Sequence, residues 1–190
     1  MRRRTMRPAS GRVWTGAILT LLLLHLGAPR AHAAGEIVPS LGVTKPVDGD
    51  GNAKMSGNLA LRGHLLPILM TEVGVGYRSE ERFDDQLKIR QWPVTASVYL
   101  APPSSILYAG AGAGWYHTSY DYKDNTLFQD ETRQQFGVHL GGGLQVPLGS
   151  HAGVDLNGRY VMMRDQKAKL IPEKFDPDFW TTSLGLAIKF

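Results

Sequence analysis

Hydrophobic and polar residues alternate with a period of two along most of the chain after residue 34, and helical periodicity is nearly absent. From 180 to 190, even positions read W, T, L, L, I and F, whereas odd positions read T, S, G, A and K. Such alternation is typical of β-strands with two unlike faces. The pattern predicts eight antiparallel strands, over about 35–47, 56–66, 68–78, 88–101, 104–119, 133–147, 151–164 and 178–190.

Connections between the expected strands alternate in length. Residues 48–55, 79–87, 120–132 and 165–177 are long and polar, whereas Pro67, Pro102-Pro103 and residues 148–150 mark tight turns. No segment after residue 33 approaches the roughly 18 consecutive apolar residues of a spanning helix. Short turns at one end and long loops at the other are typical of outer-membrane barrels. The sequence therefore predicts an all-β, eight-stranded, antiparallel, up-and-down transmembrane β-barrel over residues 34–190, with both ends of that domain at the short-turn, periplasmic side.

The apolar face of such a barrel points to lipid, whereas in a soluble barrel it points inward. Bulky aromatics on the apolar face help to distinguish the two. Six expected strands place one aromatic 10 to 12 residues from a short turn or the C-terminus. That distance corresponds to a rise of roughly 25–28 Å along a tilted strand, which matches the apolar band of a membrane barrel. The predicted aromatic girdle consists of Tyr77, Trp92, Trp115, Phe136, Tyr160 and Trp180.

The first 33 residues have the pattern of a cleavable signal peptide. Five arginines up to Arg12 precede an apolar run that starts at Ala17 and ends near Leu26, and Ala31-His32-Ala33 fits a small-x-small cleavage site. The apolar run is too short to span a membrane as a helix. We therefore expect a signal peptide over residues 1–33, with export through the general secretory translocase because an outer-membrane barrel must arrive unfolded.

Charge and cysteine content exclude several classes of function. The segment 1–33 holds six of the 21 basic residues and none of the 17 acidic ones, so 15 basic and 17 acidic residues remain, a formal net charge of −2. The basic balance of the whole chain therefore gives no support for nucleic-acid binding. The absence of cysteine excludes disulfides, thiolate nucleophiles and cysteine-ligated metals.

Several motifs resemble strands of small Gram-negative barrels. The run YAGAGAG at 108–114 resembles their Y-x-G-A-G-x-G strand, and QFG at 135–137, GGGL at 141–144 and RY at 159–160 resemble the two strands after it. The last residues, LGLAIKF at 184–190, look like the terminal strand read by the barrel-assembly machinery, with Phe190 as the assembly signal. Together they are similar to the outer-membrane protein β-barrel superfamily, which includes OmpA-like and OmpW-like barrels. The resemblance implies the fold and a bacterial outer-membrane location, but no particular function, because the shared residues are architectural.

Charged and polar residues fall on the expected inner face. The register around Pro67 places Arg62 diagonally near Glu72, and a hairpin centred on Gly149 places Arg159 opposite His139. Buried charges are costly unless paired, so these residues favour a charge-paired plug, with a narrow polar pore as the alternative. The candidate lumen network consists of Arg62, His64, Glu72, His139, Asp155 and Arg159.

Two neighbouring strands also carry an inward row of glycines. The row consists of Gly110, Gly112, Gly114, Gly137, Gly141 and Gly143. Tight curvature of a small barrel explains such a wall. The missing side chains leave room for inward tyrosines, or alternatively for a ligand or water.

Two further motifs bear on catalysis and metal binding. His117 and Ser119, with Glu131, have the residue types of a hydrolase and resemble lipid A deacylases, but the residues after Ser119 and the position of the motif depart from that family's pattern. The acidic run at 48–52 lacks the Gly and Glu that a calcium loop needs at its sixth and twelfth positions. We therefore expect no catalytic set, metal site or cofactor.

The expected function is that of a non-enzymatic outer-membrane barrel, structural or binding through its loops, with a closed or nearly closed polar lumen. One alternative is an OmpW-like narrow channel for small, mainly hydrophobic molecules, and a remote one is a lipid A-modifying hydrolase. Outer-membrane lipids, lipopolysaccharide, the barrel-assembly machinery and the secretory translocase are the expected partners.

Overall fold

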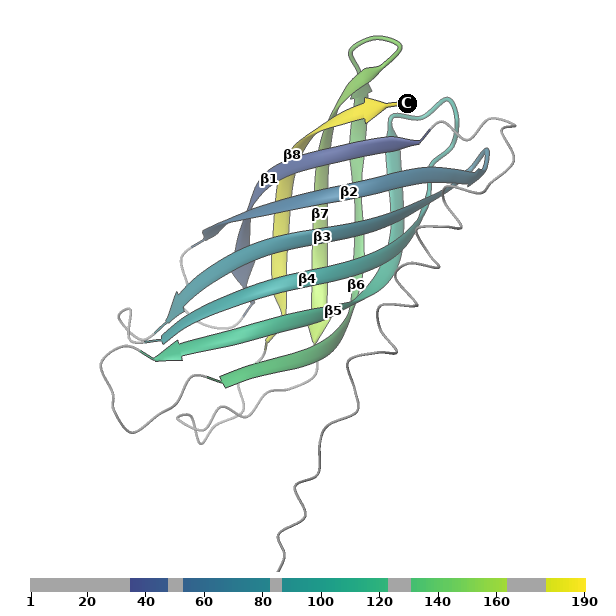
Figure 1. Cartoon of the computed structure of the whole chain (residues 1–190). Coiled ribbons are helices and arrows are strands. Elements are labelled where there is room, and N and C mark those ends of the chain that lie inside the picture. The colour runs from purple at the N-terminus through teal and green to yellow at the C-terminus, as the bar shows by residue number, and fades with distance from the viewer. Residues whose placement is uncertain (1–34, 48–52, 83–86, 123–130, 164–176) are drawn as a thin grey trace, which may run out of the picture. The chain divides into compact units, whose positions relative to one another are not determined.

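The computed structural model describes residues 35–47, 53–82, 87–122, 131–163 and 177–190. They form eight antiparallel strands, each paired with its neighbours in the chain, and β8 closes the barrel against β1 (Figure 1). The predicted signal peptide lies outside the described residues. The strands are β1 Glu36–Pro46, β2 Lys54–Leu66, β3 Leu69–Arg82, β4 Leu87–Leu100, β5 Leu107–Tyr122, β6 Glu131–Pro147, β7 Ala152–Met163 and β8 Phe179–Lys189.

All eight predicted strands are present; the largest difference in their bounds lies at the long-loop end of β3, and β5 starts and ends three residues later than predicted. β3 continues to Arg82 and β5 to Tyr122, into segments that the sequence predicts as loops. Beyond the lipid both faces of a strand contact water, so the alternation disappears although the backbone ladder continues. Pairing such as Glu81 with Lys88 and Asp121 with Lys88 therefore extends into polar sequence.

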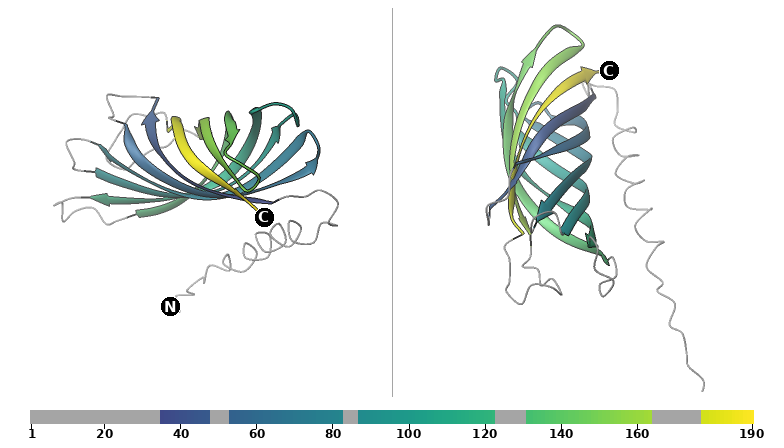
Figure 2. Two further views of the ribbon diagram at one scale, coloured as in Figure 1. Left: turned by 90° about the horizontal axis from the view of Figure 1, so that it is seen from above. Right: turned by 90° about the vertical axis from the view of Figure 1, so that its left-hand side faces the viewer.

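The C-terminus lies at the short-turn end of the barrel, beside the start of β1 (Figure 2). The amide of Phe190 donates to the carbonyl of Gly35 at 2.9 Å, and the amide of Lys189 donates to the carbonyl of His151 in the β6–β7 turn at 2.9 Å. Both ends of the barrel domain are thus held at one rim by backbone hydrogen bonds.

Burial alternates along the strands with the apolar side chains outside. Leu41, Leu140 and Leu184 are each more than half exposed, whereas Arg62 and Glu72 are at most 2% exposed. This distribution is the inverse of a water-soluble protein, in which charges are almost never fully buried. The outer surface thus has the polarity that a lipid environment requires, as the sequence predicts.

Candidate functional site

The guanidinium group of Arg62 on β2 lies at the centre of the lumen's ionic contacts. Its Nε donates to Glu72 Oε2 at 2.7 Å, and β3 holds Glu72 directly opposite Arg62. Its two terminal nitrogens donate to the two carboxylate oxygens of Asp155 at 2.6 and 3.1 Å. This two-point contact is the strong geometry for an arginine–carboxylate pair.

A second guanidinium, that of Arg159 on β7, completes the charge balance. Its Nη2 donates to Glu72 Oε1 at 2.6 Å, so each oxygen of Glu72 accepts from a different arginine. Its Nε donates to Asn157 Oδ1 at 2.8 Å, and Asn157 Nδ2 donates to the Tyr108 hydroxyl at 3.0 Å. Tyr108 in turn donates to Asp155 Oδ2 at 2.9 Å.

We call these six residues the plug. They come from β2, β3, β5 and β7, and two cations balance two anions. Every member is at least 90% buried, and each of the four charges has an opposite charge within 2.7 Å. The plug consists of Arg62, Glu72, Tyr108, Asp155, Asn157 and Arg159.

The register differs from two sequence-based expectations. Arg62 and Glu72 are directly opposite rather than diagonal. Arg159 pairs with Gly141, and His139 pairs with Val161, so the predicted opposition of Arg159 and His139 is wrong. The β6–β7 hairpin is centred one residue later than Gly149, and a one-residue change of the turn centre moves every cross-strand partner by two.

Two predicted network histidines lie outside the plug. The Nε2 atom of His139 lies 2.9 Å from Ser97 Oγ, while its Nδ1 is buried without a hydrogen-bond partner. His64 lines a separate pocket at the short-turn end, together with Glu36 and Lys189. Of the predicted network, the structure therefore brings together four residues and not the histidines.

The inward glycines lie beneath the large lumen side chains. A Cβ on Gly141 would lie 2.8 Å from Arg159 Cγ, and one on Gly143 would lie 2.6 Å from the Tyr108 hydroxyl. On Gly112 it would meet His139 Nε2 at 2.5 Å, and on Gly137 it would meet Tyr116 Cε2 at 2.9 Å. The space left by these four glycines is thus occupied by the protein's own side chains.

A different group of residues crosses the lumen nearer the long-loop end. Arg78 Nε donates to Gln91 Oε1 at 2.6 Å, and Gln91 Nε2 donates to Thr118 Oγ1 at 2.8 Å. The Arg78 guanidinium also lies 3.7 Å from the centre of the Phe179 ring, a cation–π contact. We call these four residues the outer cluster. Gln91 and Thr118 were not singled out from the sequence, although their even spacing from inward residues on the same strands is the signal that identifies them.

The predicted girdle residues form three contacting pairs between neighbouring strands on the lipid side. Ring centres lie 4.6 Å apart in Tyr77–Trp92, 5.6 Å in Trp115–Phe136 and 4.6 Å in Tyr160–Trp180. The predicted assembly signal, Phe190, is 67% exposed at the barrel rim.

Of the two minor motifs, the acidic run at 48–52 lies outside the described residues, and the hydrolase-like set is described only in part. Ser119 Oγ lies 3.4 Å from Thr132 Oγ1, and no hydrogen bond joins it to His117; the side chain of Glu131 lies outside the described residues. Among the described residues, no three His, Asp or Glu side chains are grouped as metal ligands. In that same part of the chain, no helix has the length and apolarity to cross a membrane.

A closed barrel with an apolar exterior and a charge-paired interior defines an integral membrane β-barrel. The profile of the Outer membrane protein beta-barrel domain family matches residues 17–190, and the chain belongs to that family. It is a small β-barrel protein of the bacterial outer membrane. No curated protein sequence matches the chain.

Solved structures of small barrels share the fold at low sequence identity. Neisserial surface protein A (NspA) aligns with a TM-score of 0.63 at 14% identity, over 83% of this chain and 97% of that one. OprG from Pseudomonas aeruginosa aligns with a TM-score of 0.60 at 16% identity, over 83% and 96%. Ail, the attachment invasion locus protein of Yersinia pestis, aligns with a TM-score of 0.51 at 19% identity, over 83% and 97%. At these identities the likeness shows the fold alone.

Proposed function

We propose that this protein is a non-enzymatic outer-membrane barrel with a closed lumen, and that its role is structural or consists of binding through the loops at the long-loop end. The observation that carries the proposal is the plug, in which four charges from β2, β3 and β7 join across the lumen. An eight-stranded barrel has an interior that side chains fill.

An ion that crossed the lumen would have to break several contacts of the plug, and this supports a closed lumen. Three ion pairs of 2.6 to 2.7 Å link the four charges, and Tyr108 and Asn157 satisfy further polar atoms on the same level. Separating one partner would leave a buried charge unpaired, which is strongly unfavourable. On the short-turn side, Met70 and Tyr99 pack with Tyr108 as a buried apolar cluster.

Two surfaces of the barrel support the proposed partners: the lipid-facing exterior and the rim at the short-turn end. Exposed leucines and the three aromatic pairs suit outer-membrane lipid and lipopolysaccharide, because aromatic rings favour the edge of the apolar band. Phe190, exposed at the short-turn rim, suits recognition by the barrel-assembly machinery.

Single-channel recording of the folded chain in planar bilayers tests closure. We expect no steady conductance for the unaltered protein. Simultaneous replacement of Arg62, Glu72, Asp155 and Arg159 by serine should produce a measurable conductance, because it removes all four charges and most of the plug's volume.

A matched control replaces a lipid-facing residue, Leu140→Ala, and should conduct no more than the unaltered protein. Steady conductance of the unaltered barrel under an applied voltage would overturn the closed lumen. An unchanged, silent record for the four-serine variant, once its folding is verified by the altered gel mobility of unheated samples, would show that the plug is not what closes it.

A further inference from the structure

The strands on one side of the barrel continue well beyond the girdle aromatics at the long-loop end (Figure 1). On β3 to β6 the described ladder extends five to seven residues past the girdle aromatic of the strand, whereas on β7 it extends three and on β8 one. Aromatic rings mark the edge of the apolar band, so outward residues just beyond them lie at the level of the lipid headgroups. The outward face of β4 to β6 can therefore contact a headgroup as well as acyl chains.

Two cross-strand rows on the outward face of β4 to β6 present hydrogen-bond donors and no carboxylate. In the row farther from the girdle, Arg90 lies opposite Ser119, and Ser119 lies opposite Thr132. In the row nearer the girdle, His117 lies opposite Gln134. Cross-strand neighbours on one face have their Cβ atoms about 5 Å apart, so neighbouring members are within reach of one phosphate-sized group. We call these five residues the rim cluster.

Each member of the rim cluster can donate a hydrogen bond, and one of them carries a fixed positive charge. The Arg90 guanidinium offers a planar fork that matches two oxygens of a phosphate. Arg90 and His117 are both exposed, and the neutral His117 ring carries an N–H in either tautomer. Ser119 Oγ lies 3.4 Å from Thr132 Oγ1, which brings two hydroxyls to one spot. Such a set of donors suits an oxyanion rather than a cation, for which it provides no carboxylate.

Acidic positions bound the rim cluster on the side away from the girdle. The next outward residue of β4 is Lys88, which pairs in register with Glu81 on β3 and with Asp121 on β5. With two acidic positions beside one lysine, that row does not favour an anion, so we leave it outside the cluster. The donors are therefore concentrated in the two rows next to the girdle, at the level of the headgroups.

On the other side of the barrel, the outward face carries an acid at the corresponding position. The residue two positions beyond the girdle residue Trp180 on β8 is Asp178. Its carboxylate accepts from the Tyr160 hydroxyl at 2.9 Å and from the Met163 amide at 2.8 Å. Lys45 on β1 lies opposite Trp180, and this exposed lysine gives the barrel a cation of the same charge away from the rim cluster. The two sides can thus be compared in one experiment.

We infer that the rim cluster binds a phosphate group of lipopolysaccharide, the phosphorylated glycolipid of the outer leaflet. The long-loop end of an outer-membrane barrel faces outward, so this leaflet is the one that the cluster meets. Nearer the middle of the membrane on β6, the exposed side chains of Val138 and Leu140 offer an apolar surface to the acyl chains of the same molecule. The inference rests on the lipid partners proposed above and is independent of the closed lumen. It gives His117 and Ser119 a binding role instead of a catalytic one.

NMR titration of the folded chain in dodecyl maltoside micelles, labelled with ¹³C at histidine Cε1, tests the site. The probes are added separately: rough lipopolysaccharide, the same material freed of phosphate with hydrofluoric acid, phosphatidylglycerol and sodium phosphate. We expect the His117 signal to move saturably with intact lipopolysaccharide, and the phosphate-free material to bind at least about tenfold more weakly. His64, His139 and His151 lie in the lumen or near the short turns and should not move in parallel.

Substitutions that remove one charge on either side of the barrel separate a specific site from general attraction. Arg90→Gln should weaken the binding of intact lipopolysaccharide about tenfold, because it removes hydrogen bonds to a charged group. Lys45→Gln removes the same charge beside Trp180 and is the matched control, with an expected change of less than about twofold. The double variant Ser119→Ala with Thr132→Val should weaken binding about threefold, since two neutral donors are lost. The altered gel mobility of unheated samples verifies that each variant is folded.

The inference is overturned if the phosphate-free material or phosphatidylglycerol binds as tightly as intact lipopolysaccharide, or if sodium phosphate at the same concentration moves the His117 signal equally. It is also overturned if Arg90→Gln and Lys45→Gln weaken binding to the same extent. Tight binding that no substitution in the rim cluster weakens would keep lipopolysaccharide as a partner but overturn this site. The absence of any binding would remove the proposed partner as well, whereas the conductance test of the lumen is unaffected by either result.

Discussion

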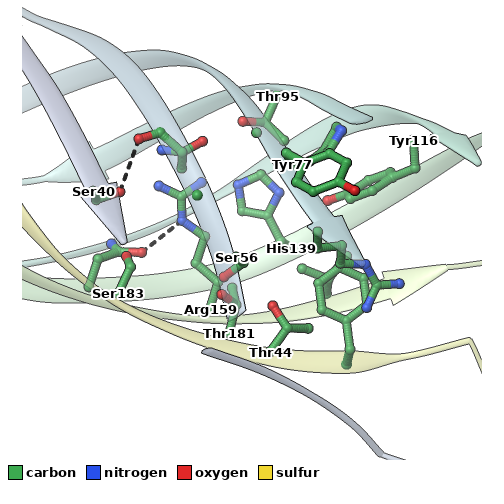
Figure 3. A pocket seen from close by; sticks show the side chains of 18 residues that line it. Ser40, Thr44, Ser56, Tyr77, Thr95, Tyr116, His139, Arg159, Thr181 and Ser183 are labelled. Carbon is green, nitrogen blue, oxygen red and sulfur yellow. Dashed lines mark hydrogen bonds between the residues drawn. The ribbon is translucent and has the colours of Figure 1, made fainter. Parts of the chain in front are cut away.

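The plug and the outer cluster both cross the same lumen with an arginine, yet they satisfy it differently. The plug surrounds Arg62 and Arg159 with two carboxylates at 2.6 to 2.7 Å. In the outer cluster, the contacts of Arg78 include the amide of Gln91 and the face of Phe179. Ionic contacts join four side chains into one layer, and a cavity of about 70 Å³ lies between that layer and the outer cluster (Figure 3). The comparison indicates that charge pairing fills the plug's level of the lumen, which is the basis of the proposed closure.

The largest expected effect comes from removing one carboxylate of the plug. Glu72→Ala leaves the two guanidinium groups with Asp155 as their only acidic partner in the plug, and should destabilise the folded barrel by about 3–5 kcal/mol. Urea unfolding in lipid vesicles, followed by tryptophan fluorescence, measures the change. The double variant Glu72→Leu with Arg159→Met leaves Arg62 and Asp155 balanced, and should be more stable than Glu72→Ala. A double variant that is the less stable of the two would contradict the charge-balance account.

The next largest loss of stability is expected at two inward glycines, one beneath Tyr108 of the plug and one beneath Tyr116. A Cβ on Gly143 would collide with the backbone carbonyl of Leu156 and lie 2.6 Å from the Tyr108 hydroxyl, so Gly143→Ala should cost about 2–3 kcal/mol. On Gly137 the nearest atoms are side-chain atoms of Tyr116 and Met163 at 2.9 and 3.0 Å, which can shift, so about 1 kcal/mol is expected.

Gly158→Ala is the matched control for both alanine variants. A Cβ there would meet nothing within 4 Å, so the stability should stay within about 0.5 kcal/mol of the unaltered chain. The same unfolding measurement applies to all three. If Gly158→Ala lowers the stability as much as Gly143→Ala, then glycine is needed in these strands for a reason other than the packing of the plug.

A smaller loss of stability is expected from a substitution in the outer cluster. Gln91→Leu removes the hydrogen bonds to Arg78 and Thr118 without removing a charge, and should cost about 1.5 kcal/mol. Single-channel recording should remain silent, because the plug is untouched. A loss as large as that of Glu72→Ala would erase the distinction between the two layers.

The smallest effect is expected on the lipid face. Trp180→Leu keeps an apolar side chain but loses the ring contact with Tyr160 at 4.6 Å, and should cost about 0.5–1.5 kcal/mol. Ile188→Leu, also on the lipid face, is the control and should be nearly neutral. Should Trp180→Leu also open the lumen to ions, closure would depend on the exterior as well as on the plug.

Much of this architecture follows from the alternation of apolar and polar residues. Local sequence decides the number of strands, their inward and outward faces and the tight turns. An alternation with a period of two is therefore enough to predict them. The same reasoning ended the third and fifth strands too early, because Arg82 and Tyr122 lie where alternation no longer accompanies pairing. It also placed His139 in the charged network, because the turn centre was taken one residue too early.

The sequence by itself determined that the charged side chains share the inside of an eight-stranded barrel, since the side-chain period assigns each residue to a face whatever the register. Only the tertiary structure decided that Asp155 pairs with Arg62, 93 positions away, and that His139 contacts Ser97 rather than the plug. The physical reason is that barrel closure and strand stagger set which inward residues meet across the lumen. Those distances depend on all eight strands together rather than on any local pattern.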